Sequence, residues 1–160
     1  MAQLIPNSVW TGLNTTFEQD LPATAQLLAL LQRERVLLEV RNYKDFQSII
    51  DQKQKLLSLL DHHSNIRQQL LQQAGLKDEA STLQAAHQQA PALAQSWIKL
   101  GTQWADCQQL NEINERIAQR SRLVVGQVLD LLRGQNKQEK LYDVKGYTNN
   151  SNSGRSITSA

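Results

Sequence analysis

The sequence predicts an all-α protein: an antiparallel bundle or coiled coil of three long helices, followed by a flexible C-terminal tail. Of its 160 residues, 25 are leucine and 22 are glutamine, whereas seven are glycine and three are proline. This composition favours long helices over sandwiches and barrels. Apolar residues recur at helical spacing over about 17–42, 45–74 and 91–134. The length allows one core of ordinary size, so we expect a helical bundle domain over 1–134 and a flexible polar tail over 135–160.

The first helix is predicted from a leucine-rich stripe. Residues 1–16 show no sustained periodicity, and we therefore expect a loose N-terminal arm. From Phe17 onward, apolar side chains fall on one side of a helix; they are Phe17, Leu21, Leu28, Leu31 and Leu38. Pro22 is tolerated in a first helical turn, where no backbone N–H is needed, so this helix begins at residue 16 or at residue 21.

The second helix follows a pause in the apolar stripe near residues 41–45, where a turn and a kink fit the pattern equally well. Asn42 and Asp45 have the spacing of an N-cap arrangement. We expect the helix to end at Ala74 and Gly75, because glycine suits the left-handed position that follows a helix. Residues 75–90 have few large apolar side chains, which predicts a connection that can include a helical turn.

The third helix has the most regular pattern. An apolar seam recurs about every 3.5 residues, the spacing of a coiled coil or bundle helix. Its members are Leu93, Trp97, Leu100, Trp104, Cys107, Leu110, Ile113, Ile117, Ser121, Val124, Val128 and Leu131. Arg133 and Gly134 make a basic last turn and a stop signal. At about 1.5 Å per residue the helix is roughly 65 Å long, against about 40–45 Å for each earlier one, so one end is expected to extend beyond its partners.

Charge, hydropathy and cysteine content argue against several classes of protein. Seventeen basic and fifteen acidic residues leave a net charge of +2, and the excess lies in the tail. Nucleic-acid binding needs Lys and Arg concentrated on one surface, so we expect none. No apolar run approaches the roughly 20 residues of a membrane helix, and the N-terminus lacks the pattern of a signal peptide. The single cysteine, Cys107, cannot form an internal disulfide, which favours a cytoplasmic location.

No catalytic, metal or cofactor site is predicted. The sequence lacks phosphate-loop, dinucleotide-binding, zinc-protease and nucleophile-elbow motifs. His62 and His63 are adjacent and point about 100° apart on a helix, and His87 lies on another segment, so we expect surface or partly buried histidines. Cys107 occupies an apolar seam position with no local base, which indicates a buried thiol. The protein is therefore not expected to be an enzyme.

The seam of the third helix offers two candidates for binding. Trp97 and Trp104 are interpreted as core residues packed between helices, with exposed binding aromatics as the alternative. Near the end of the seam, the shorter helices leave apolar residues uncovered; they are Leu123, Val124, Val128, Leu129, Leu131 and Leu132. This strip is predicted to bind either a partner's amphipathic helix or a second copy of the chain, and the pattern favours neither.

The tail contains a third candidate. Residues 140–147, KLYDVKGY, hold sizeable apolar side chains within a segment that is otherwise rich in Asn, Ser, Gly and Thr. Such a segment buries too little apolar surface to fold alone. Its apolar residues favour docking to another molecule, and the alternative is that the segment folds back on its own bundle.

Taken in their order along the chain, the predicted helices and the tail resemble the bacterial flagellar export chaperone family FlgN. The resemblance is carried by LLALLQRERVLLEVRNYKDFQSIIDQKQKLLSLL at 27–60 and by LNEINERIAQRSRLVVGQVLDLL at 110–132. The terminal LYDVKG, followed by a tail rich in Gly, Ser and Asn, completes it.

The resemblance implies a cytosolic, non-catalytic chaperone of the flagellar type III export system. Such a chaperone binds the C-terminal amphipathic helices of the hook–filament junction proteins FlgK and FlgL and delivers them to the export gate. The client-binding residues that it implies are Leu123, Val124, Val128, Leu131 and Leu132.

The resemblance also implies docking to the export-gate subunit FlhA through Leu141 and Tyr142. Asp143 occupies a position where the family commonly has glycine, which is a departure from the family pattern. The alternative function is that of a homo-oligomeric coiled-coil structural or adaptor protein, such as a homodimer that uses the same strip.

Overall fold

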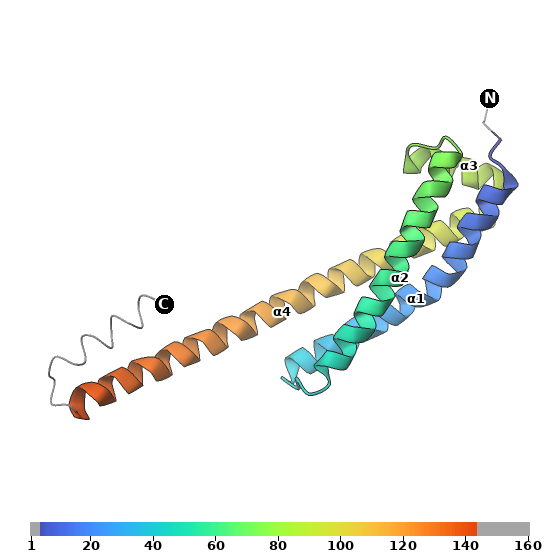
Figure 1. The fold of residues 1–160 in the computed structure, drawn as a ribbon. Helices are drawn as coiled ribbons and strands as arrows, with labels where there is room; N and C mark the ends of the chain where they lie inside the picture. Colours follow the sequence, from blue (N-terminus) through green and yellow to red (C-terminus); the bar gives the residue numbers. More distant parts are fainter. Residues whose placement is uncertain (1–3, 144–160) are drawn as a thin grey trace. The chain divides into compact units, whose positions relative to one another are not determined.

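The structure is a computed structural model that describes the backbone of residues 4–143 and the side chains of residues 4–134. Four helices follow one another: α1 (Asn7–Glu39), α2 (Phe46–Gln73), α3 (Glu79–Gln89) and α4 (Pro91–Asp143) (Figure 1). No strand occurs within 4–143, so the all-α prediction is confirmed, with four helices in place of three. The chain divides into two compact units, Met1–Glu115 and Arg116–Ala160. The predicted division into a bundle over 1–134 and a tail stays a prediction.

In the first unit, α1 and α2 pack side by side in antiparallel directions. Asp20 of α1 contacts His63 and Arg67 of α2, whereas Glu34, further along α1, contacts Lys53. As residue numbers rise along α1, those of the partners fall along α2. The antiparallel arrangement predicted for the first two helices is therefore confirmed.

The first part of α4 packs alongside α1 and runs parallel to it. The Thr24 hydroxyl donates to Gln103 Oε1 at 2.8 Å, and Asn114 Nδ2 donates to the Leu31 carbonyl at 2.9 Å. From the first of these contacts to the second, the residue numbers rise along both α1 and α4. Because α2 ends beside the start of α1, a chain that reverses direction there runs parallel to α1, and α3 with its flanking turns makes this connection.

The prediction of a loose arm over 1–16 is wrong from residue 7 onward, because α1 begins at Asn7. Tertiary contacts hold this end of the helix: Gln89 Oε1 accepts hydrogen bonds from the Ile5 N–H at 3.1 Å and from Trp10 Nε1 at 3.3 Å. Several apolar side chains here are buried; they are Ile5, Val9, Trp10 and Leu13. Polar neighbours on the exposed face mask this stripe in the sequence. The helix also does not begin at residue 16 or 21, and Pro22 lies inside it.

The break between α1 and α2 is a turn, and both helices end with the same backbone motif. At the end of α2, Gly75 has φ 73° and the Leu76 N–H donates to the Leu71 carbonyl at 2.9 Å. This is the glycine-terminated end that the sequence predicts. At the end of α1, Arg41 takes the left-handed position with φ 55°. The backbone N–H of the residue after it donates a hydrogen bond equivalent to the one at the end of α2. A left-handed arginine has no sequence signal, because the position normally selects glycine.

The connection expected over residues 75–90 contains an eleven-residue helix, α3. Asp78 caps its start: the Asp78 Oδ1 atom accepts a hydrogen bond from the Ser81 N–H at 2.7 Å. The bonds from the backbone and side chain of Ser81 hold the pKa of Asp78 below its usual value. Thr82 and Ala86 bury the inner face of α3. Small residues form this contact, which is why the segment shows weak apolar periodicity.

Helix α4 begins at Pro91, as predicted, and is the longest helix at 53 residues. Its predicted end at residue 134 is wrong, because the helix continues to Asp143. Gly134 lies within it, and an exposed glycine inside a helix costs only about 1 kcal/mol. The Gln, Lys and Glu residues that follow are good helix formers. The predicted tail over 135–160 therefore overlaps α4, and residues 144–160 lie outside the described residues.

Two apolar clusters form the core of the first unit. One joins the start of α1 to α3 and α4, and it includes Trp10, Leu13, Phe17, Ala86 and Leu93. The other joins the middle of all three long helices, and it includes Ala23, Leu27, Leu31, Leu60 and Cys107. The predicted burial of Cys107 is confirmed, and this burial raises the pKa of its thiol, which favours the unreactive protonated form.

Polar clusters cross the same interfaces. Asp20 is fully buried; its carboxylate accepts from His63 Nδ1 at 2.5 Å and from Arg67 Nη1. His62 and His87 are exposed, as predicted, whereas His63 is buried, so the prediction is wrong for His63. Buried charges need such partners, because an unpaired ion away from water is costly. The second cluster, near the end of α1, joins Glu34 to Lys53 and Asn114.

Candidate functional site

The predicted client-binding residues lie on one exposed stretch of α4 in the second unit. Leu131 is 71% exposed and Val128 is 48% exposed. Val124 and Leu132 are exposed to a similar degree. With about 100° of rotation per residue, Val124, Leu131 and Leu132 lie within about 60° of Val128 around the helix axis. Four of the five predicted residues therefore share one face.

Leu123 does not share this face. Five residues before Val128, it lies about 140° away around the helix, although it is also exposed. Two other exposed residues, Val125 and Leu129, lie within about 100° of Val128 and extend the face. The name "α4 face" denotes these six residues below: Val124, Val125, Val128, Leu129, Leu131 and Leu132.

Arginines border the α4 face on both sides. Arg116 and Arg120 lie about 80–120° from Val128 in one direction, and Arg122 and Arg133 lie about 120–140° away in the other. All four are exposed. Between residues 116 and 134 the only acidic residue is Asp130, which lies about 160° from Val128. This segment is therefore a basic amphipathic helix.

Leu141 and Tyr142, the residues expected to dock to the export gate, lie inside the bounds of α4. Their side chains fall outside the described residues, and Asp143 is the last residue of the helix. The helical backbone of these residues differs from the free tail that the sequence predicts. Their role stays a prediction.

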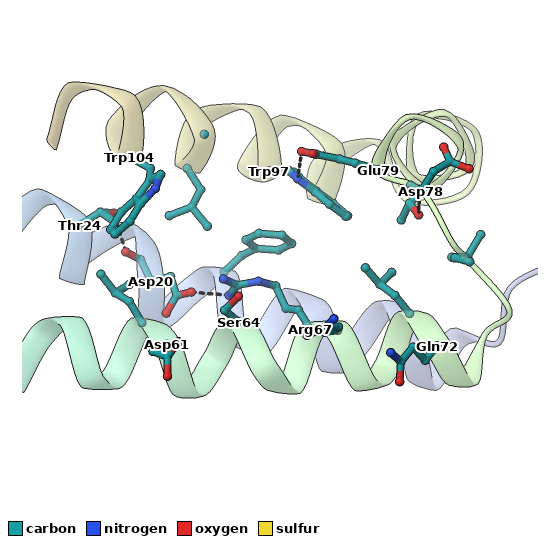
Figure 2. Close-up of a pocket in the computed structure, with 18 of the residues that line it drawn as sticks. Asp20, Thr24, Asp61, Ser64, Arg67, Gln72, Asp78, Glu79, Trp97 and Trp104 are labelled. Carbon is teal, nitrogen blue, oxygen red and sulfur yellow. Dashed lines mark hydrogen bonds and ion pairs between the residues drawn. The ribbon is translucent and has the colours of Figure 1, made fainter. Parts of the chain in front are cut away.

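The first unit contains a groove that the sequence did not predict (Figure 2). It has a volume of about 910 Å³ and is bounded by α2 and α4, with α1 at its floor and α3 at one end. Its apolar lining comes from Phe17, Leu57, Leu60, Leu71, Leu76, Trp97, Leu100 and Trp104. Figure 2 shows Trp97 and Trp104 on the α4 wall, across the groove from Ser64 and Arg67 on the α2 wall, with Asp61 also on α2.

The two tryptophans differ in their surroundings. Trp97 is half-buried; its ring centroid lies 5.5 Å from that of Phe17, and its Nε1 donates to Glu79 Oε1 at 3.3 Å. Trp104 is 37% exposed and lines the open groove. The interpretation of both as core residues is thus wrong for Trp104, which fits the exposed-aromatic alternative. Trp97 and Trp104 are seven residues apart and therefore belong to the same apolar seam. Periodicity alone cannot tell which tryptophan is buried and which is exposed.

The floor of the groove combines the Phe17 ring with the polar side chains of Asp20 and Thr24. The Arg67 guanidinium lies 5.2 Å from the centroid of the Phe17 ring and donates to Asp20. Such a cation over an aromatic face adds to the ion pair. The sequence offered no signal for this arrangement, because its members are separated by more than 40 residues and only the fold brings them together.

The described residues hold no group of three or more His, Cys, Asp or Glu that could bind a metal ion. Within the same part of the chain, none of the helices has the length and apolarity needed to cross a membrane.

A contiguous exposed apolar helix face is typical of surfaces that interact with proteins or membranes. The fold and the α4 face thus define an α-helical protein with an exposed apolar helix face. The FlgN protein family matches residues 10–150 of the chain. A crystal structure of a flagella synthesis protein FlgN from Pseudomonas aeruginosa is similar, with 30% sequence identity and a TM-score of 0.62, over 75% of this chain and 94% of that chain. None of the curated proteins compared with the chain matches it.

The chain therefore belongs to the FlgN family. Its role is connected with the bacterial flagellum, and the family is one of flagellar proteins and not of enzymes. The predicted resemblance is confirmed.

Proposed function

We propose that this protein is a cytosolic chaperone of the flagellar type III export system. It binds the C-terminal amphipathic helices of the hook–filament junction proteins FlgK and FlgL and delivers them to the gate subunit FlhA. The observation that supports this most directly is the α4 face, six exposed aliphatic side chains on one side of a helix. Membership of the FlgN family supports the flagellar setting.

Binding at the α4 face requires no chemical step. A client helix that places apolar residues at i, i+3, i+4 and i+7 interlocks with the aliphatic side chains on the face. Covering about 400 Å² of apolar surface is worth roughly 10 kcal/mol before the costs of association and ordering are subtracted. The net affinity is expected to lie between micromolar and nanomolar. The covered client helix is then kept from self-association until it reaches the gate.

The bordering arginines add selectivity to this apolar contact. Exposed guanidinium groups on both sides of the face favour client helices with acidic flanks. They also disfavour basic helices, through like-charge repulsion. The face thus selects partners by charge, while aliphatic packing supplies most of the affinity.

Aspartate substitutions on the α4 face test the client-binding proposal. We expect Val128→Asp and Leu131→Asp each to weaken binding of a client C-terminal peptide at least tenfold, because a carboxylate cannot be desolvated against an apolar helix without cost. The measurement is titration calorimetry without nucleotide, with circular dichroism as the check on helicity. Leu123→Asp is the matched control: an equally exposed leucine off the face, whose replacement should leave affinity within about twofold. Equal loss in all three variants, or none in any, contradicts the proposed face.

A second substitution separates client binding from gate docking. Tyr142→Ala is expected to weaken binding to the cytosolic part of FlhA while client affinity is unchanged, because Tyr142 lies ten residues beyond the last residue of the α4 face. Pull-down of FlhA with the loaded complex, alongside peptide titration, measures both. Loss of both activities would mean that the two sites are not separate.

A further inference from the structure

The groove of the first unit has the form of an unfilled helix position. Helices α2 and α4 form its walls and α1 its floor, so that three sides of a four-helix arrangement are present. Its α2 wall runs from Leu57 to Gln72, about four helical turns. Leu57 and Trp104 remain at least one-third exposed on opposite walls. A space with these walls and this apolar lining suits the apolar face of one further helix.

The charges around the groove favour a basic occupant. Among the lining residues, four carboxylates, Asp20, Asp61, Asp78 and Glu79, outnumber the two cations, Arg67 and Lys77. Arg67 is paired with Asp20 at the floor. Asp61 on α2 and Glu79 on α3 are exposed at the rim, where they can meet cations on an incoming helix.

The segment of α4 from residue 116 to residue 134 has the complementary properties. Its α4 face presents aliphatic side chains to fill the groove, and four arginines border that face against a single aspartate on the far side. It is about 28 Å long, which exceeds the four turns of the α2 wall. Apolar shape, charge and length thus agree between two surfaces of this one chain.

We infer that the α4 face of one molecule occupies the groove of a second molecule, and that the second reciprocates, so that the protein forms a two-fold dimer in the absence of client. Reciprocal exchange gives an isologous interface in which each copy provides one groove and one helix. This goes beyond the proposed function, because it assigns a role to the groove. A client helix must then displace the second copy from the α4 face, which couples client loading to dissociation of the dimer.

Two charge-reversed full-length proteins test this inference. The helix variant combines Arg120→Glu with Arg122→Glu, one arginine from each border of the α4 face. The groove variant combines Asp61→Lys with Glu79→Lys at the rim. All four side chains are exposed; Glu79→Lys also removes the acceptor of the Trp97 Nε1 hydrogen bond, so circular dichroism checks that each variant is folded. Sedimentation velocity over a range of concentrations measures the mass, with no client present.

The wild-type protein should approach twice the 18.1 kDa of the chain as concentration rises. Each variant alone should dimerise at least tenfold more weakly, since like charges then meet in both grooves. Mixing the two variants should restore a heterodimer, because glutamates then face lysines in one groove and arginines face aspartate and glutamate in the other. A segment that filled the groove of its own chain could not produce this rescue.

Three results would overturn the inference: a wild-type protein that stays monomeric at all concentrations, a folded pair of variants that fails to associate on mixing, or a dimer that the groove variant retains in full. The last result would mean that two α4 faces pair with each other. Since the experiment contains no client, its failure would leave client binding by the α4 face untouched. Failure of the client titration would likewise leave the dimer untouched.

Discussion

Replacing Asp20 by alanine is expected to lower the free energy of unfolding by about 3–5 kcal/mol, the cost of removing one partner from a buried ion pair. Asp20 is fully buried, and its carboxylate is the shared acceptor for His63 and Arg67. Without it, both α2 side chains remain in the interface with no acceptor there. Urea unfolding followed by circular dichroism measures the change.

The exposed pair Arg35 and Glu39 provides the matched control for this prediction. The Arg35 Nε and Glu39 Oε1 atoms lie 3.1 Å apart on the surface of α1, where solvent screens the interaction. Arg35→Ala should change the free energy of unfolding by no more than about 0.5 kcal/mol. A loss below about 1 kcal/mol for Asp20→Ala would show that this cluster does not hold α1 and α2 together.

The second large effect is expected at Phe17. Phe17→Ala should lower the free energy of unfolding by about 3–5 kcal/mol, because it removes a buried ring and leaves a cavity. The ring contacts Trp97 on α4 and lies under the Arg67 guanidinium, so its loss loosens both walls of the groove. Thermal and urea unfolding measure this, and Phe17→Leu should lose markedly less because it retains most of the apolar volume.

Phe17 and Asp20 should also be coupled. Arg67 contacts both, so that either substitution alone frees the guanidinium from one of its two partners. The double variant should therefore differ from the sum of the single losses by more than about 0.5 kcal/mol. Strict additivity would contradict a shared role for Arg67.

The local parts of the fold were predictable. Gly75 ends α2 and Pro91 begins α4 because each residue type suits its position regardless of the rest of the chain. The apolar seam of α4 placed Cys107 in the core by the same local argument. The apolar pattern also predicts the exposed end of the seam, although helical rotation sets Leu123 about 140° apart from Val128.

The rest depended on contacts between distant residues. Gln89 stabilises the start of α1 from the far end of α3, and no feature of the first sixteen residues reveals it. Small buried residues such as Thr82 pack α3 without an apolar stripe. The groove depends on how far α2 and α4 lie apart, a distance that no single-helix pattern contains. Sequence periodicity tells which side of a helix is apolar, but not which apolar side is covered.

The placement of the three tryptophans has a practical consequence. Trp10 is buried at the start of α1, and Trp97 and Trp104 both line the groove, with Trp104 the most exposed of the three. An indole emits at longer wavelength when water surrounds it than when apolar groups do. The natural fluorescence of the protein is therefore concentrated where an occupant of the groove would exclude water, and a shift of its emission to the blue would report that event without any attached dye.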